Sequence, residues 1–244
     1  MVKKNSTSPE VIDCACVIHS NGYDWIYVEK LYNMLRRNLT SDVRFHVYTE
    51  ASRAIPSHMI KHSLDEWAGV AGPKKSWWYK MQLFNSAHYA GPLLYFDLDV
   101  VITDNIDWIT KQPLEYFWAP RDFKRLWSPN HTGINSSVMW WNTEKFHDVW
   151  LNFRQQDFPL LQRRYPGDQD FLSDIITQDR RRFLDERLIR SWKWECFDGG
   201  YDFKRRTNKA PGAGTHLSGA GVLVFHGEPN PNEVQDPVIL RHWQ

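Results

Sequence analysis

Cysteine is scarce in this chain of 244 residues, which has three. Cys14 and Cys16 stand too close together to form an easy disulfide, and Cys196 alone supplies no second pair for a zinc knuckle. This content excludes a disulfide framework and is typical of a reducing compartment, so we expect a cytoplasmic protein.

A net charge of either sign and a membrane-spanning stretch are also missing. The 30 Lys and Arg against 29 Asp and Glu leave a formal net charge of +1, which removes nucleic acid as the default partner. No run approaches the roughly 18 apolar residues of a membrane span. Residues 1–10 are polar, and Asp13 interrupts the apolar run after them. We therefore expect no transmembrane segment and no signal peptide.

Aromatic side chains, by contrast, are abundant. They make up 15% of the residues and include 13 Trp. Aromatic rings fill protein cores, and they also suit the flat faces of sugars and stacked bases. The hydrophobic and charged fractions, 42% and 24%, are those of a globular protein. Composition alone indicates a globular enzyme or binding domain.

Hydrophobic periodicity predicts an α/β fold. Residues 11–18 have the pattern of a buried strand, residues 24–39 that of an amphipathic helix capped by Asp24, and residues 44–50 that of a second strand. This order is typical of a parallel sheet under helices. Further strands are predicted at 92–103, 136–141 and 221–226, and helices at 76–88, from Thr143 and at 168–176. We predict one domain over residues 1–244, with irregular insertions near 110–133 and 198–220.

The strand predicted at 92–103 is apolar except for Asp97 and Asp99. Residues two apart on a strand share a face, so both carboxylates should leave the sheet on one side. Such a pair is costly unless a cation or hydrogen-bond donors compensate it, and oxygen ligands of this kind suit Mg²⁺ or Mn²⁺. His226, at the end of the last predicted strand, offers a third ligand. The alternative is a strand end that emerges into solvent.

Four segments in the order LLYFDLDVVI, GINSSVMWWN, PGDQDF and VFHGEPNP resemble glycosyltransferases of the GT-A fold. The resemblance is strongest to glycosyltransferase family 8 and its bacterial and phage relatives, and it runs from about Val11 to Val234. It implies an α/β fold with a mixed, mostly parallel sheet flanked by helices. It also implies transfer of a sugar from a nucleotide-sugar, typically a UDP-sugar, to a glycan or other hydroxyl acceptor, usually with retention and with Mn²⁺ (or Mg²⁺).

The resemblance assigns roles to individual residues. Asp97 and Asp99 would be the D-x-D pair and would hold the metal with His226, which Gly227 follows. The other implied donor contacts are Lys80, Asn135, Ser136 and Ser137, with the nucleobase and ribose held by the loop from His19 to Tyr23. The Asp-Gln-Asp segment, Asp168, Gln169 and Asp170, would lie on the reacting side of the sugar, with Asp168 and Gln169 as the catalytic candidates. The residue types agree with this, since a carboxylate or amide oxygen can stabilise positive charge on the anomeric carbon. The alternatives are a helix cap for Asp168 and a solvated helix face for Lys80.

One position departs from the resemblance. The last motif usually carries a Lys that binds the diphosphate, and this chain has Asn230 near that position. Either Lys204, Arg205 or Lys209 supplies the missing charge, or neutralisation depends more on the metal.

The acceptor and the class of activity stay open at this level. Basic runs at 163–164, 180–182 and 204–206 are either solvated faces or the seat of an anionic acceptor, such as a lipid-linked glycan headgroup or a modified base in duplex DNA. One member each of Trp77-Trp78 and Trp140-Trp141 would be core and the other would line the cleft, and Trp127 is an acceptor-stacking candidate. The competing classes are a nucleotide-sugar or glycan-binding module without turnover and a metal-dependent phosphoesterase or nucleotidyltransferase. The sequence does not predict an oligomeric state.

Overall fold

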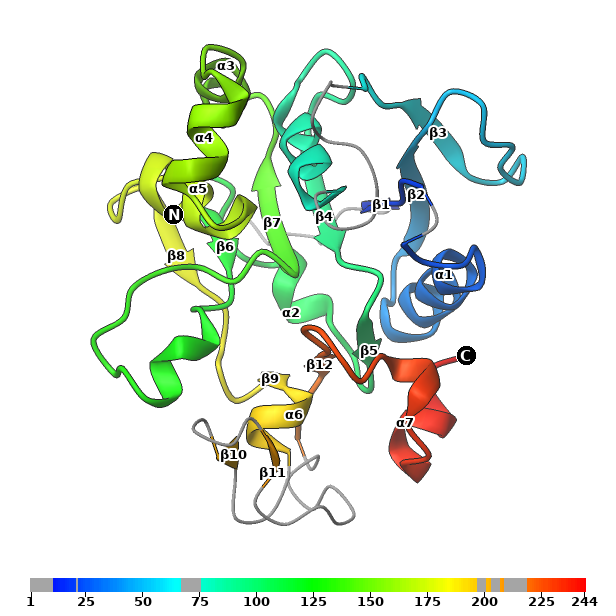
Figure 1. The fold of residues 1–244 in the computed structure, drawn as a ribbon. Coiled ribbons are helices and arrows are strands. Elements are labelled where there is room, and N and C mark those ends of the chain that lie inside the picture. The colour runs from blue at the N-terminus through cyan, green and yellow to red at the C-terminus, as the bar shows by residue number, and fades with distance from the viewer. Residues whose placement is uncertain (1–10, 21, 67–75, 197–200, 203–206, 209–218) are drawn as a thin grey trace, which may run out of the picture.

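The computed structural model describes residues 11–20, 22–66, 76–196, 201–202, 207–208 and 219–244. Its larger sheet has seven strands, in the spatial order β3 (Ile60–Ser63), β2 (Asp42–Thr49), β1 (Val11–Val17), β4 (Pro92–Phe96), β7 (Val138–Asn142), β6 (Phe117–Ala119) and β8 (Arg181–Phe183). Four neighbouring pairs are parallel, and β7 runs antiparallel to β4 and β6. This confirms the predicted α/β class with a mixed, mostly parallel sheet (Figure 1).

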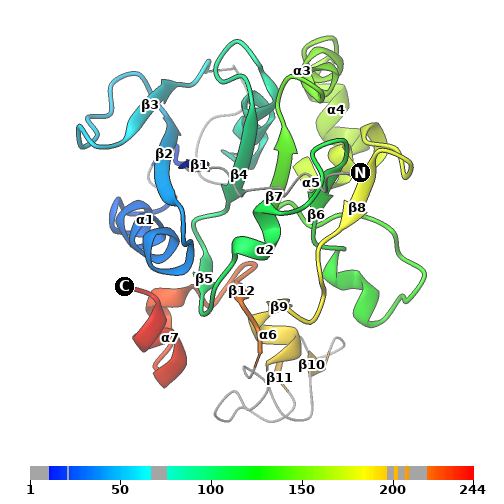
Figure 2. The ribbon, with the colours of Figure 1, turned by 180° about the vertical axis from the view of Figure 1, so that it is seen from behind.

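A smaller sheet lies at one end of the larger one (Figures 1 and 2). It consists of β5 (Val100–Ile102), β12 (Val222–Val224) and β9 (Ile189–Ser191), with β12 antiparallel to β5 and parallel to β9. A two-stranded ladder joins β10 (Tyr201–Asp202) to β11 (Thr207–Asn208). Because β4 and β5 belong to different sheets, the chain passes from one sheet to the other at residues 97–99.

Helices cover both faces of the larger sheet. The helices α1 (Ile26–Asn38) and α7 (Pro237–His242) contribute to one apolar core, with β1, β5 and β12. The opposite core contains side chains of the 3₁₀ helix η1 (Ser76–Phe84), α3 (His147–Arg154), α4 (Phe158–Arg164) and α5 (Asp168–Ile175). The remaining short helices are α2 (Asp107–Thr110), η2 (Phe123–Leu126), α6 (Trp192–Glu195) and η3 (Pro231–Glu233). The sheet is therefore flanked by helices on both faces, as the predicted α/β class requires.

Two helix starts differ from the prediction. The first helix begins at Ile26 with Trp25 in the N-cap position, and Asp24 Oδ1 accepts the Ile26 N–H at 3.1 Å from outside the helix. The helix expected from Thr143 begins at His147. Thr143 is buried, and its hydroxyl donates to the carbonyl of Tyr89 at 2.7 Å. In both places a short polar side chain stabilises the connection before the helix instead of capping it.

The helix predicted at 76–88 is a 3₁₀ helix that ends at Phe84. With three residues per turn, side chains three apart lie above one another. Trp78, Met81 and Phe84 therefore form one buried row, while Trp77 and Lys80 share a different face. Both Trp77 and Lys80 line the cavity described below.

Among the described residues, no helix is both long enough and apolar enough to span a membrane. The insertion expected near 110–133 contains β6 and η2. Most of the insertion expected near 198–220 lies outside the described residues.

Candidate active site

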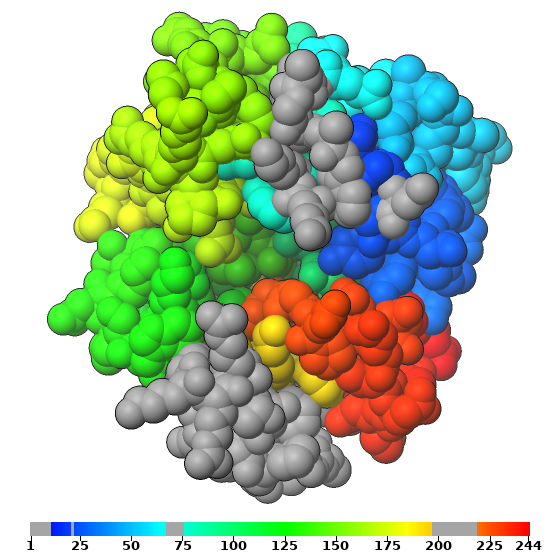
Figure 3. All heavy atoms as spheres, in the orientation of Figure 1, coloured from blue at the N-terminus to red at the C-terminus, as the bar shows by residue number. Residues whose placement is uncertain are grey.

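A cavity of about 620 Å³ opens where strands of the larger sheet end, and Figure 3 shows this face hollowed near its centre. The cavity is lined by all the residues to which the resemblance assigned metal, donor or reacting-side roles: His19, Tyr23, Lys80, Asp97, Asp99, Asn135, Ser136, Ser137, Asp168, Gln169, His226 and Gly227. The parallel strands β1 and β4 end here, and the antiparallel β7 begins here. Carboxyl ends of parallel strands are where open α/β sheets bind ligands.

The D-x-D pair lies in a turn between two sheets, so the single strand predicted at 92–103 is wrong. Strand β4 ends at Phe96 and β5 begins at Val100. The Asp97 N–H donates to the carbonyl of Ser137 at 2.8 Å, which ties the turn to the start of β7. The two carboxylates face one cavity because of this turn, and not because of strand alternation.

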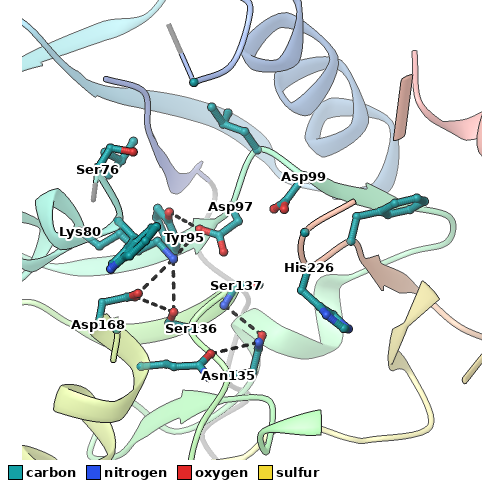
Figure 4. A pocket seen from close by; sticks show the side chains of 18 of the residues that line it. Ser76, Lys80, Tyr95, Asp97, Asp99, Asn135, Ser136, Ser137, Asp168 and His226 are labelled. Carbon is teal, nitrogen blue, oxygen red and sulfur yellow. Dashed lines mark hydrogen bonds and ion pairs between the residues drawn. The ribbon is translucent and has the colours of Figure 1, made fainter. Parts of the chain in front are cut away.

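A buried ammonium group joins three elements at the floor of the cavity (Figure 4). Lys80 Nζ lies 2.8 Å from Asp97 Oδ1, 3.3 Å from Asp168 Oδ2 and 3.2 Å from Ser136 Oγ. The Ser136 hydroxyl donates to Asp168 Oδ2 at 2.6 Å, and the Tyr95 hydroxyl donates to Asp97 Oδ1 at 2.6 Å. Burial opposes the charge, but the two carboxylates hold the pKa of Lys80 above its ordinary value. The structure therefore excludes a solvated helix face for Lys80.

Asp168 does not cap α5. The N-cap residue is Gly167, which makes no side-chain cap bond, and the Asp168 side chain faces Lys80 and Ser136 instead. Burial raises the pKa of this carboxyl, against the opposing effect of Lys80. Its neighbour Gln169 donates from Nε2 to Asp122 Oδ2 at 3.3 Å. Both side chains are thus held in position by other elements of the fold.

Among the described residues, no Lys or Arg side chain forms an ion pair with Asp99 of the kind that Lys80 forms with Asp97 and Asp168. Burial, and then the negative charge of Asp97, raise the pKa of Asp99 to about 7, although Lys80 and a hydrogen bond with the Tyr23 side chain act in the opposite direction. A buried carboxylate beside a second one is stabilised by a bound cation. The pair Asp97 and Asp99 therefore fits a divalent ion, because Mg²⁺ and Mn²⁺ take oxygen ligands and can be held by one or two carboxylates together with substrate phosphates.

His226 is oriented by other partners. Its Nε2 lies 2.6 Å from Ser191 Oγ, and its ring centroid lies 4.0 Å from that of Trp194 and 5.3 Å from that of Phe123. Burial and the positive charge of Lys193 lower the pKa of His226 to about 3. Figure 4 shows the imidazole pointing away from Asp99. Within the described part of the chain, no three His, Cys, Asp or Glu side chains converge as metal ligands, so His226 and the D-x-D pair do not form a ready-made cluster.

The loop after β1 reaches the cavity with two aromatic side chains. The His19 ring lies 4.2 Å from the Tyr79 ring, centroid to centroid, and its Nε2 lies 3.2 Å from Glu66 Oε1. The Tyr23 hydroxyl is engaged with Asp99. Burial, followed by the charges of Asp99 and Asp97, raises the pKa of Tyr23 well above its ordinary value. Tyr23 thus connects this loop to the D-x-D turn.

Lys193 is a candidate that the sequence analysis missed. It donates to the carbonyl of Glu228 at 3.0 Å, and its Nζ lies 3.6 Å from the position that a Cβ on Gly227 would occupy. Burial lowers its pKa, against the effect of Asp99 and Glu228. Asn230, by contrast, caps η3. Lys204, Arg205 and Lys209 lie outside the described residues.

Of the remaining aromatic and basic candidates among the described residues, only Trp77 lines the cavity. In the first Trp pair, Trp78 is buried and Trp77 lines the cavity with 37% of its surface exposed, as predicted. In the second pair, Trp140 and Trp141 are both buried, so the prediction that one of them lines the cleft is wrong. Trp127 does not line the cavity and packs edge-on against Trp194. The Arg side chains at 163–164 and 180–182 are not among the lining residues, and Arg164 and Arg180 pair with Asp174 and Asp148. The described basic runs therefore do not converge on the cavity.

Gly227 needs a backbone conformation that other residues adopt with strain. Its φ is +72°, whereas Gly221 has no positive φ and a Cβ there would meet ordinary contacts of 3.7 Å or more. We expect Gly227→Ala to lower the free energy of unfolding by about 1–2 kcal/mol. Urea denaturation compared with Gly221→Ala tests this. Equal stability of the two variants would contradict the assigned backbone.

No family model matches the chain, and no curated protein is similar to it. Solved structures share its fold. A galactosyltransferase, LgtC, in complex with donor and acceptor sugar analogs matches with a TM-score of 0.60 and 16% identity, covering 94% of this chain and 93% of that one. The glycosyltransferase GlyE of Streptococcus pneumoniae gives 0.59 and 15%, over 90% of this chain and 55% of its own. WbbM, a bifunctional glycosyltransferase, gives 0.60 and 12%, over 91% and 46%. The chain therefore has the fold of these glycosyltransferases, as the resemblance implies.

Proposed function

We propose that this protein is a metal-dependent glycosyltransferase that moves a hexose or pentose from a nucleotide-sugar, in the first instance a UDP-sugar, to a hydroxyl acceptor with retention. The observation that carries the proposal is the pairing of the buried Lys80 with the buried Asp168 and with Asp97, beside Asp99, at the strand ends of a glycosyltransferase fold. A binding module without turnover does not need this costly burial of charge.

In the proposed reaction, the bond between the anomeric carbon and the diphosphate oxygen breaks with its electron pair on the diphosphate. The acceptor oxygen forms the new bond to the anomeric carbon and passes its proton to the departing nucleoside diphosphate, which then leaves the site. A bound Mn²⁺ or Mg²⁺ would supply charge neutralisation at the diphosphate. Asp97 and Asp99 would hold that ion, with His226 as a further candidate ligand if its ring turns from Ser191.

The other residues act on the sugar and the phosphates. Lys80 holds the Asp97 and Asp168 side chains in place through its two ion pairs. Asp168 and the amide oxygen of Gln169 would face the anomeric carbon as positive charge develops there. Asn135 Nδ2 lies 3.5 Å from Gln169 Oε1 and, with Ser136, would bind the donor sugar. Lys193, beside Gly227, would place a positive charge near the diphosphate.

The His19 to Tyr23 loop borders the same cavity and would contact the nucleobase and ribose. The packing of His19 on Tyr79 supports this, because it holds the imidazole as a flat wall. The acceptor in this proposal is a glycan. A modified base in DNA is the second acceptor to test, although no described basic run reaches the cavity.

Metal removal and a donor panel test the proposal. We expect release of free nucleoside diphosphate from one nucleotide-sugar in the presence of Mn²⁺, and we expect EDTA to abolish it and added Mn²⁺ to restore it. The same donor should raise the melting temperature only together with the metal. A stabilising donor that is never cleaved would indicate a binding module. Cleavage of nucleotides that carry no sugar would indicate a phosphoesterase, and full activity in EDTA would contradict the metal assignment.

A further inference from the structure

One part of the cavity is not used by the proposed donor chemistry. Trp77, Lys124, Gly167 and Asp170 line it. Trp77 and Lys80 share a face of η1 one turn apart, which corresponds to a rise of roughly 6 Å. Trp77 is 37% exposed, whereas the next residue, Trp78, is 1% exposed. The structure thus presents an indole ring at the cavity wall, one turn above the buried Lys80.

Charged side chains line the same part of the cavity as this indole ring. A Cβ at Gly167 would lie 3.9 Å from Trp77 Nε1 and 3.8 Å from Asp170 Oδ2, so both side chains border the same short stretch of backbone. Lys124 of η2 faces them, with its Nζ 3.8 Å from Asp170 Oδ1 and 3.7 Å from Asp122 Oδ2. An aromatic face beside hydrogen-bond donors and acceptors matches a sugar ring, which has an apolar CH face and a rim of hydroxyl groups.

The charges of the cavity indicate which sugars fit. The described residues that line it include four aspartates (Asp97, Asp99, Asp168 and Asp170) and two lysines (Lys80 and Lys124), which gives a formal charge of −2 when all six are ionised. Both ammonium groups already have carboxylate partners. A divalent cation adds two positive charges, and the diphosphate of a nucleotide-sugar adds about two negative ones. The net charge of the cavity is therefore the same with both bound as with neither. A negatively charged acceptor would be repelled here.

We propose that Trp77, Lys124 and Asp170 form the acceptor subsite, and that the acceptor is an uncharged sugar stacked on Trp77. The Lys124 ammonium donates hydrogen bonds to hydroxyl groups of this sugar, and the Asp170 carboxylate accepts hydrogen bonds from them. Lys124 also disfavours a positively charged acceptor next to the indole. This inference rests on the proposed glycosyl transfer and adds the substrate class.

Tryptophan variants test the subsite. Trp77→Ala should raise the acceptor KM by about tenfold or more, because the stacking surface is lost. Trp127→Ala is the matched control, since Trp127 is the other large exposed aromatic residue among the described ones and does not line the cavity. It should change the acceptor KM less than twofold. Trp77→Phe should recover part of the loss. Equal KM values for Trp77→Ala and the wild type would overturn the subsite.

Matched acceptors test the charge. Methyl glycosides of neutral hexoses and those of the corresponding uronic acids differ only at C6, where a carboxylate replaces the hydroxymethyl group. The transfer products are measured by mass spectrometry. The neutral series should exceed the uronides at least tenfold in kcat/KM. The inference would be overturned if the uronides were used as well as the neutral series or better. It would also be overturned by glycosylation of duplex DNA with hydroxymethylated bases, or by donor cleavage that modifies no neutral glycoside. Hydrolysis of the donor in the absence of acceptor distinguishes failure of this inference from failure of the proposed function. If no donor is hydrolysed, the proposed glycosyl transfer is itself contradicted.

Discussion

Asp99→Asn should lower metal-dependent donor cleavage by on the order of 10³-fold, because the loss of several kcal/mol of charge stabilisation corresponds to about that factor. The substitution keeps the size of the side chain and removes its charge. Asp99 is partly buried next to Asp97, and this surrounding raises its pKa to about 7. A neutral amide at this position no longer opposes the charge of Asp97, so the chain should fold at least as well as the wild type.

Three measurements on Asp99→Asn check this expectation: Mn²⁺ titration, turnover and thermal unfolding without metal. Asp104→Asn is the matched control, since Asp104 is exposed and does not line the cavity. It should behave as the wild type in all three. Retained turnover in Asp99→Asn would contradict the metal assignment. A large fall in its melting temperature would instead indicate that Asp99 is needed for folding.

Lys80→Met should destabilise the protein by about 3–5 kcal/mol and also abolish activity, because it leaves two carboxylates without their cationic partner. Asp97 and Asp168 both contact the ammonium group, and Asp168 is buried. Few substitutions outside the apolar core should cost this much. Urea unfolding gives the change in free energy.

Two further variants test whether the lost charge of Lys80 causes the destabilisation. Lys80→Met combined with Asp168→Asn removes one buried carboxylate, and it should recover much of the lost stability without recovering turnover. Lys80→Arg keeps the charge and should lie between the wild type and Lys80→Met in stability. If Lys80→Met were as stable as the wild type, the buried ammonium would not neutralise these carboxylates.

The sequence predicted the class of fold and the residues that meet at the cavity. Strand and helix periodicity located β1, α1 and β2, and the ordered motifs led to the D-x-D pair, to Asn135 and Ser136, to Asp168 and Gln169, and to His226, all of which line the cavity. Local pattern cannot show a change of sheet, because the residues on both sides of Asp97 and Asp99 are equally apolar and read as one continuous strand. The break between β4 and β5 depends on long-range pairing with β1 and β12.

Two other features of the site were equally hidden. The orientation of His226 depends on Ser191 and on aromatic rings from η2 and α6, which are distant in sequence. Lys193 and Lys124 carry no motif signal, since a lone Lys between aromatic or polar residues is usual on a surface. Lys193 becomes notable only once α6 is seen beside Gly227.

The threefold period of η1 limits how this segment can vary among related sequences. Loss or gain of one residue between Trp77 and Lys80 would rotate one side chain relative to the other by about 120°. Either Lys80 would leave Asp97 and Asp168, or Trp77 would enter the row of Trp78, Met81 and Phe84. Natural relatives should therefore accept changes of residue type along Ser76–Phe84 more readily than changes of its length, and insertions should be found at its ends.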